Sequence, residues 1–180
     1  MARLKEKYKT EIRAALQETF GIKNAMAIPR LRKMVISMGI GDAKDDKAKL
    51  ETATKQLTLI AGQKPLVMKA KKSVSNFKLR DGQPVGLKVT LRRERMYEFL
   101  DRLISLAIPR VKDFRGLNPS GFDGRGNYNM GLSEQSIFPE IDPASITFIQ
   151  GMNISFETSA ESDEQARELL LQIGMPFRTN

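Results

Sequence analysis

Three segments of this chain alternate apolar and polar residues with a period of two. Because successive side chains of a β-strand point to opposite faces, such alternation predicts strands that bury one face and leave the other open. The segments are residues 33–40, 87–91 and 152–157, and residues 66–70 form a shorter strand-like run. In residues 87–91 the polar positions are Lys88 and Thr90, so this strand is expected to present a polar, basic face.

Four other segments place their apolar residues three and four positions apart, which predicts amphipathic helices. They cover residues 4–19, 47–61, 96–107 and 162–173. Gly21, Gly62, Pro109 and Gly174 are expected to end them, and the Ser162 hydroxyl can cap the last one. The first helix has a basic exposed face, which fits either a docking helix with a solvated exterior or direct contact with RNA.

The irregular order of these segments predicts an α+β fold, with an antiparallel, possibly mixed, sheet and helices packed on one face. The length of 180 residues fits a single domain, residues 1–180. Long projecting loops are expected at about residues 69–86 and 109–143. Irregular stretches of this length are usually functional, so they are where function is sought.

Charge is distributed unevenly along the chain. Residues 1–125 hold 28 of the 30 Lys and Arg. Of the 21 Asp and Glu, 8 lie in the shorter segment of residues 126–180. A basic portion of this length favours a polyanionic partner, most simply nucleic acid, over a membrane surface or a purely solubilising role. The acidic remainder suggests a basic partner or a solvated flank.

The chain contains no His and no Cys, which removes the usual general base and the commonest soft metal ligands. Gly39 and Gly41 follow a predicted strand, but Lys44 stands where a dinucleotide fingerprint needs its third glycine. We therefore expect no enzyme, no catalytic residue, no cofactor and no metal. No run approaches the ~20 apolar residues of a membrane span, and no apolar stretch follows the basic start. A cytoplasmic protein without a membrane partner is expected.

The first predicted loop is strongly basic. Residues 69–84 place five cations around one aromatic residue, Phe77. Cations supply phosphate contacts, and an aromatic ring can stack on a base or ribose. The alternative is a solvated hairpin in which Phe77 folds back onto the core.

The second predicted loop is rich in glycine. Gly116, Gly121, Gly124 and Gly126 lie among Phe114, Phe122 and Tyr128. Glycine permits positive φ angles and close approach of the backbone, so the segment is an ordered recognition loop or a disordered tip, and the aromatic residues favour order. Composition leaves RNA and protein open as its partner.

Several longer motifs resemble the bacterial form of the large-subunit ribosomal protein five family. They run in order along the whole chain, at residues 28–31 (IPRL), 37–41 (SMGIG), 61–65 (AGQKP), 72–80 (KSVSNFKLR), 88–92 (KVTLR), 108–116 (IPRVKDFRG), 122–128 (FDGRGNY), 138–141 (FPEI) and 176–178 (PFR). The resemblance implies a structural constituent of the large ribosomal subunit, in which an antiparallel sheet is covered by helices. It also implies that the protein binds 5S rRNA, attaches it to the subunit and contacts 23S rRNA.

Three sets of residues follow from this resemblance and from the charge pattern. The expected 5S rRNA site comprises Arg30, Arg32, Lys33, Ser37, Gln63, Lys64, Lys88, Thr90 and Arg92, where the family usually has asparagine at the position of Ser37. The loop expected to face the P-site tRNA comprises Lys71, Lys72, Ser73, Asn76, Phe77, Lys78 and Arg80. The expected intersubunit bridge, to a small-subunit head protein of the ribosomal protein thirteen family, comprises Phe114, Arg115, Gly116, Phe122, Asp123, Gly124 and Arg125.

Two other classes of function compete with this interpretation. A free-standing RNA chaperone or regulator would share the basic composition, and a sequence-specific DNA binder is a weaker third candidate. Co-sedimentation of nearly all of the protein with ribosomes at moderate salt would separate a ribosomal constituent from both.

Overall fold

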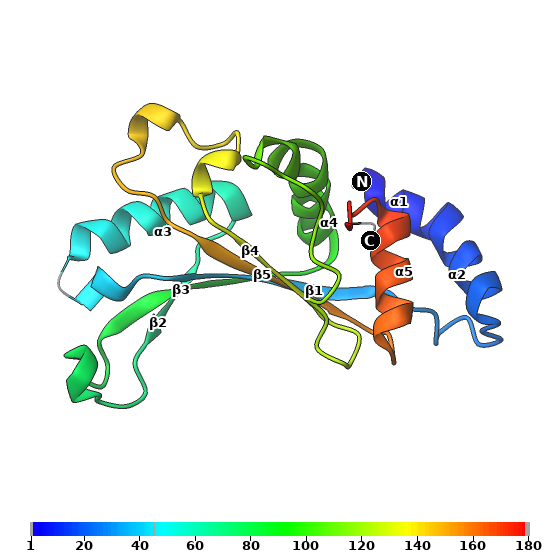
Figure 1. Cartoon of the computed structure of the whole chain (residues 1–180), viewed down its shortest axis with the longest axis horizontal. Helices are drawn as coiled ribbons and strands as arrows, with labels where there is room; N and C mark the ends of the chain where they lie inside the picture. The colour runs from blue at the N-terminus through cyan, green and yellow to red at the C-terminus, as the bar shows by residue number, and fades with distance from the viewer. Residues whose placement is uncertain (1, 45, 179–180) are drawn as a thin grey trace. The chain divides into compact units, whose positions relative to one another are not determined.

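The computed structural model describes residues 2–44 and 46–178. Five strands form one sheet in the order β2-β3-β1-β5-β4, which confirms the predicted α+β class with an antiparallel sheet. The strands are β1 (Leu31–Gly39), β2 (Leu66–Lys69), β3 (Pro84–Leu91), β4 (Tyr128–Leu132) and β5 (Met152–Thr158). The helices are α1 (Arg3–Lys7), α2 (Arg13–Phe20), α3 (Lys47–Ala61), α4 (Arg93–Arg102) and α5 (Asp163–Ile173) (Figure 1).

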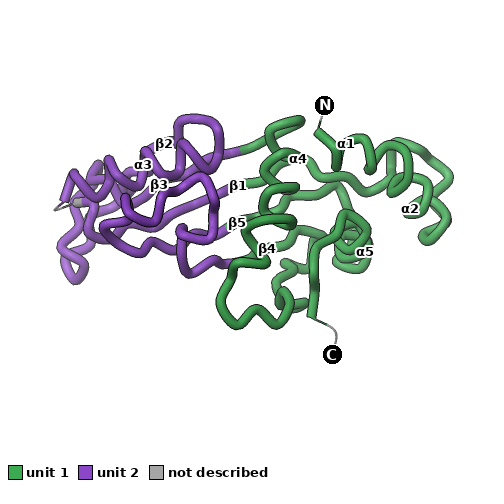
Figure 2. The backbone as a smooth tube through the Cα atoms, turned by 90° about the horizontal axis from the view of Figure 1, so that it is seen from above, with its two compact units in different colours: residues 1–35, 91–130, 154–180 green, residues 36–90, 131–153 purple. Residues whose placement is uncertain are grey.

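The chain divides into two compact units (Figure 2). Unit 1 comprises Met1–Val35, Leu91–Met130 and Ile154–Asn180, and unit 2 comprises Ile36–Thr90 and Gly131–Asn153. Four of the five strands contribute residues to both units, so the prediction of a single domain stays a prediction.

The alternation of the strands is reproduced in their burial. In β1, Met34, Ile36 and Met38 are at most 2% exposed, whereas Ser37 between them is partly exposed. In β3, Leu87 is buried and Lys88 is exposed. One face of these strands therefore belongs to the core and the other stays open.

The predicted helix ends are correct in three places. Gly21, Gly62 and Gly174 each follow a helix in the left-handed conformation, with φ of 61°, 67° and 112°. The Ser162 hydroxyl accepts a hydrogen bond from the backbone N–H of Gln165 at 3.4 Å, as expected for an N-cap. A π-helical turn, Tyr8–Ile12, joins α1 to α2, and another, Leu103–Ala107, follows α4. The spacing of apolar residues does not predict these turns.

One strand lies inside the stretch predicted to be irregular. β4 alternates three buried side chains, Tyr128, Met130 and Leu132, with exposed Asn129 and Gly131. The irregular region after Pro109 is therefore shorter than predicted, because part of it belongs to the sheet.

In unit 2, α3 lies along one side of the strands, and the connection between β2 and β3 extends on the other side (Figure 1). β2 pairs antiparallel with β3, with Leu66 opposite Lys88 and Met68 opposite Gly86. A Cβ atom on Gly86 would lie 2.3 Å from the Met38 carbonyl oxygen, so glycine is required for β3 to lie this close to β1.

Candidate nucleic-acid interface

The open face of unit 2 carries Ser37 on β1 and Lys88 and Thr90 on β3. Ser37 and Thr90 are partly exposed and Lys88 is exposed, while Leu87 and Val89 on the opposite face of β3 are buried. We call Ser37, Lys88 and Thr90 the strand face. It offers two hydroxyls and one ammonium group, which can donate and accept hydrogen bonds and contact phosphate.

Gln63 lies next to this face, but its amide group also serves the fold. Its Nε2 donates to the backbone carbonyl of Thr90 at 2.9 Å, which ties the turn after α3 to β3. Lys64, the next residue, is exposed. The structure thus brings Gln63 and Thr90 together, although 27 residues separate them.

The remaining predicted 5S rRNA residues belong to unit 1. Arg30, Arg32 and Arg92 are exposed. Lys33 is different, because its Nζ lies 2.7 Å from a carboxylate oxygen of Glu157. Partly exposed ion pairs of this kind contribute about 0–1 kcal/mol, so Lys33 can exchange this partner for a phosphate at little cost.

Residues 71–80, the basic hairpin, form an ordered structure. Val74 and Leu79 exchange backbone hydrogen bonds of 2.9 and 3.1 Å, and a short 3₁₀ turn lies between them. Nearer the base, the backbone N–H of Asp81 donates to the Ser73 hydroxyl at 3.0 Å, and that of Arg80 donates to Gln83 Oε1 at 2.8 Å. Backbone and short polar side chains therefore set the shape of the hairpin.

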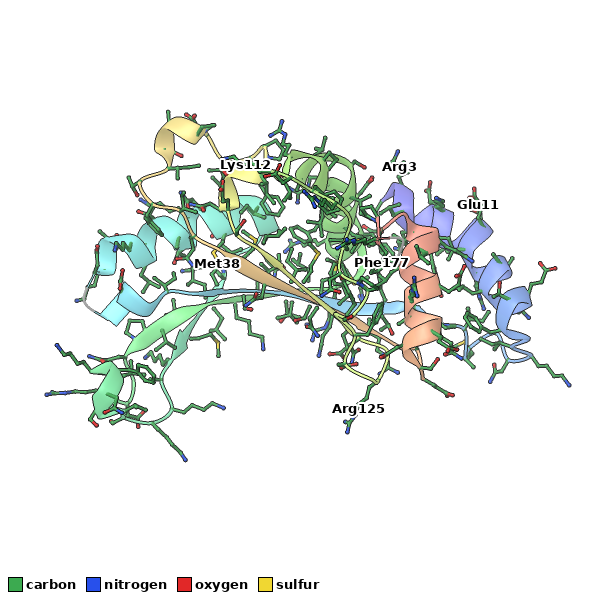
Figure 3. The ribbon with its side chains drawn as sticks, in the orientation of Figure 1. Arg3, Glu11, Met38, Lys112, Arg125 and Phe177 are labelled. Atoms are coloured by element: carbon green, nitrogen blue, oxygen red, sulfur yellow. The ribbon has the colours of Figure 1, made fainter. Side chains whose placement is uncertain are left out.

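Several side chains that end in nitrogen extend outward from the basic hairpin (Figure 3). Exposed side chains include Lys71, Lys72, Ser73, Asn76, Lys78 and Arg80. Phe77 is 73% exposed, so it is not folded back onto the core. The structure therefore favours the interpretation in which this ring is available for contact.

Residues 114–127, the glycine-rich loop, are held from several sides. Asp163, the first residue of α5, accepts hydrogen bonds from the backbone N–H groups of Gly124 (3.0 Å) and Gly126 (2.8 Å). The Thr158 hydroxyl donates to the Gly126 carbonyl at 2.7 Å. At the other end of the loop, Leu117 and Phe177 form a parallel bridge. The loop is thus ordered, as its aromatic residues indicate.

Phe122, in the middle of this loop, packs against other aromatic rings. The ring of Phe122 lies 4.8 Å from that of Tyr128 and 5.9 Å from that of Phe177, measured between centroids. Tyr128 is 1% exposed, its hydroxyl donates to the Asn118 carbonyl, and burial raises its pKa to about 12. Phe122 therefore anchors the loop, and Phe114 is half-buried.

Of the residues predicted to form the intersubunit bridge, Arg115, Asp123, Gly124 and Arg125 are exposed, and Gly116 is half-buried. Figure 3 shows Arg125 pointing away from the ribbon. The Asp123 carboxylate accepts from the Asn127 side-chain amide at 2.8 Å and from the backbone N–H groups of Arg125 and Asn127. These hydrogen bonds, the one from the Asn127 side chain first, lower the pKa of Asp123.

Sequence reasoning misses Asp163 as a residue that shapes the loop. An acidic residue directly after a Ser N-cap is explained by the positive end of the helix alone, so nothing in its position points to a partner 37 to 39 residues away.

Within residues 2–44 and 46–178, no group of three or more acidic side chains is arranged to hold a metal ion. No helix of the described chain is long and apolar enough to span a membrane.

Comparison with known proteins decides the family. The chain matches the family of ribosomal protein L5 over residues 24–80 and the C-terminus of the same ribosomal family over residues 84–177. It is 58% identical over 177 residues to large ribosomal subunit protein uL5 of Alkaliphilus oremlandii, covering 98% of this chain and 99% of that protein. It is 56% identical over 180 residues to uL5 of Rubrobacter xylanophilus, covering 100% of both. The chain belongs to the ribosomal protein L5 family.

This membership confirms the resemblance seen in the sequence. The chain is a structural, non-enzymatic protein of the large ribosomal subunit and associates with ribosomal RNA in the cytoplasm. The free-standing regulator and the DNA binder thereby lose their support.

Proposed function

We propose that this ribosomal protein L5 family member binds 5S rRNA through the strand face and attaches it to the large subunit. The carrying observation is the alternation of burial in β1 and β3, which leaves Ser37, Lys88 and Thr90 uncovered while their neighbours form the core. The wide minor groove of an RNA helix displays 2′-hydroxyls and base edges, which hydroxyl side chains can recognise. Lys64 and Gln63 lie beside this face.

The cations of unit 1 are proposed to add phosphate contacts, to 5S rRNA or to 23S rRNA. Arg30, Arg32 and Arg92 are exposed, and Lys33 is paired with a partly exposed carboxylate. Phosphate contacts carry affinity and little sequence information, so these residues are expected to set the strength of binding and its salt dependence.

The test compares the double variant Lys88→Ala, Thr90→Val with Lys55→Ala, which removes one exposed cation from α3. Binding of 5S rRNA is titrated at several salt concentrations. Losing one phosphate contact is expected to make the slope of log K against log salt shallower by about 0.7–0.9, and losing one hydrogen bond to cost about 1 kcal/mol. Gln63 is left intact because its amide holds the turn. Binding by the double variant that equals that of Lys55→Ala would refute the site.

The basic hairpin is proposed to contact the P-site tRNA. Its support is the combination of an ordered backbone with outward cations and a ring that is 73% exposed. A projection whose backbone is already ordered loses less conformational entropy when it binds a second polyanion.

The glycine-rich loop is proposed to form the intersubunit bridge, with a small-subunit head protein of the ribosomal protein thirteen family as partner. Its support is an anchored loop that exposes Arg115, Asp123 and Arg125 together. Such a mixture of signs fits a protein surface better than a phosphate backbone.

A further inference from the structure

Unit 1 contains a pocket of ≈ 270 Å³ that shares only Arg30 with the surfaces described above. Its walls come from the N-terminal helical segment, from the connection that leads into β1, and from α4. Its lining includes Tyr8, Lys9, Arg13, Met26, Arg30 and Tyr97.

Two hydrogen bonds fix the walls of the pocket. The Tyr8 hydroxyl donates to the carbonyl of Pro29 at 2.8 Å, and Nη2 of Arg13 donates to the carbonyl of Ala25 at 3.1 Å. Both bonds join the helical segment to the connection before β1. The shape of the pocket is therefore set by contacts between separate segments of the fold.

The pocket is electrostatically positive. Among the described residues that line it, the charged ones are Lys5, Lys9, Arg13 and Arg30, and none is a carboxylate. Glu94 is nearby but lies 2.9 Å from Lys5, whose hydrogen bond and charge lower the pKa of Glu94. Burial raises the pKa of Tyr97 to about 12, so this hydroxyl adds no negative charge at neutral pH.

The pocket also has an apolar part. Met26 is 74% exposed, so its apolar side chain is open to solvent at the pocket. A simple anion would use the cations and gain nothing from Met26. A nucleotide combines a phosphate with a flat, apolar-faced base, and the flexible, polarisable methionine side chain adapts to such a face.

We propose that this pocket binds one nucleotide of ribosomal RNA, with Lys9 and Arg30 contacting the phosphate and Met26 contacting an unpaired base. The proposal rests on the association of the family with ribosomal RNA and does not depend on the strand face. It assigns Arg30 to a site with the N-terminal helical segment, so that this segment both docks on the core, through buried Leu4, Ile12 and Leu16, and contacts RNA. An acidic peptide is the competing ligand, but it would leave the apolar rim without a partner.

The first arm of the test removes the cations in the double variant Lys9→Ala, Arg30→Ala. Arg13 is kept because it holds the wall. The matched control is Lys112→Ala, Arg167→Ala, which also removes one Lys and one Arg from exposed positions of unit 1. Binding of 5S rRNA and of protein-free 23S rRNA is titrated separately at several salt concentrations, and thermal unfolding is recorded for every variant.

The pocket variant is expected to bind one of the two RNAs about tenfold more weakly, with a salt slope shallower by about 1.4, because two charged contacts to a single strand are lost. The control is expected to stay within about twofold of wild type, since scattered exposed charges are screened. Which RNA responds identifies the source of the nucleotide. Equal binding by the pocket variant and the control, for both RNAs, would overturn the proposal.

The second arm tests the base contact. Met26→Ala is expected to weaken binding of the same RNA about threefold with an unchanged salt slope, because an apolar contact releases no counterions. Loss of binding to a polyglutamate peptide in the pocket variant, with RNA binding unaffected, would instead assign the site to an acidic protein. The strand-face variant, titrated in parallel, shows whether a failure belongs to this pocket or to the proposed 5S rRNA site.

Discussion

The basic hairpin and the glycine-rich loop are both long connections that carry charged and aromatic residues. They differ in the exposure of their aromatic rings and in the contacts that order them. In the hairpin, Phe77 is 73% exposed, and the ordering bonds are local, such as the pair between Val74 and Leu79. In the glycine-rich loop, Phe122 packs against Tyr128 and Phe177, and Asp163 of a distant helix holds the backbone.

This difference follows from composition. Unpaired charges are expensive to bury, so a loop dominated by Lys and Arg must stay outside and is ordered by its own backbone and by nearby short polar side chains. Because glycine has no side chain, the backbone of a glycine-rich loop can pack closely against other elements. Contacts with those elements then order the loop. The hairpin is therefore expected to tolerate substitution, and the glycine-rich loop is expected to transmit any change to the fold.

The largest effect is expected from Gly126→Ala. Gly126 has φ of 79°, and an added Cβ would lie 2.8 Å from the carbonyl oxygen of Ala160 and 3.0 Å from its Cβ. A left-handed conformation costs a non-glycine residue about 1–2 kcal/mol, and overpacking against backbone adds about 1–3 kcal/mol. We expect the free energy of unfolding, measured by urea denaturation, to fall by about 3 kcal/mol.

Gly82→Ala, two residues after the basic hairpin, is the matched control for this prediction. Gly82 has nearly the same φ, 82°, but an added Cβ would meet no atom within 4 Å. It should lose only the conformational part, about 1–2 kcal/mol. Equal losses for the two variants would show that the glycine-rich loop is no more tightly packed than the hairpin.

The second effect concerns the carboxylate that holds the glycine-rich loop. Asp163→Ala leaves the N–H groups of Gly124 and Gly126 without this acceptor, which is expected to cost about 2 kcal/mol of unfolding free energy. Because the loop that presents Arg125 loses its anchor, large subunits carrying this variant should also associate less with small subunits. Light scattering during a magnesium titration measures that association.

Asp81→Ala is the control, because Asp81 joins the hairpin through its backbone N–H to Ser73 and its carboxylate is exposed. An exposed side chain of this kind should change stability by less than about 0.5 kcal/mol and leave subunit association intact. If Asp163→Ala destabilises the protein but subunits associate normally, the loop is ordered for the fold and the bridge lies elsewhere.

The sequence predicts those features of the fold that depend on neighbours along the chain. The alternation around Met34 and Ile36 locates β1, and Gly62 and Ser162 mark helix ends, because strand periodicity and caps are local properties. The sequence does not reveal β4, although alternate residues of it are apolar, because preceding glycines and Gly131 weaken the strand signal and pairing with β5 supplies what propensity does not.

The candidate sites divide in the same way. The exposure of Lys78 and Arg80 follows from charge alone and is predictable. The bond from Gln63 to the Thr90 carbonyl, the inward position of Phe122 and the pocket beside Arg30 depend on contacts between distant segments. These contacts form only when the chain is folded, so they cannot be recognised from local patterns in a single sequence.

The smallest effect on stability, and the sharpest separation of the two loops, is expected from removing all four cations of residues 71–80. Lys71, Lys72, Lys78 and Arg80 are exposed, and the hairpin keeps its shape through backbone bonds that alanine preserves, so unfolding and 5S rRNA affinity should hardly change. The exchange of charge type, Lys71→Arg, Lys72→Arg, Lys78→Arg and Arg80→Lys, is the control that keeps the positive charge.

The quadruple alanine variant should instead release tRNA from the P site faster. Each exposed contact contributes about 0.2–1 kcal/mol, so four together are expected to speed release by about tenfold at low salt. The factor should shrink as salt rises, because exposed charges are screened, and it should be the same for different tRNAs, because phosphate contacts do not read sequence. The charge-preserving variant should release tRNA as wild type does. If the alanine variant loses 5S rRNA and holds tRNA normally, the hairpin belongs to the 5S rRNA anchor, and its outward cations serve the same partner as the strand face.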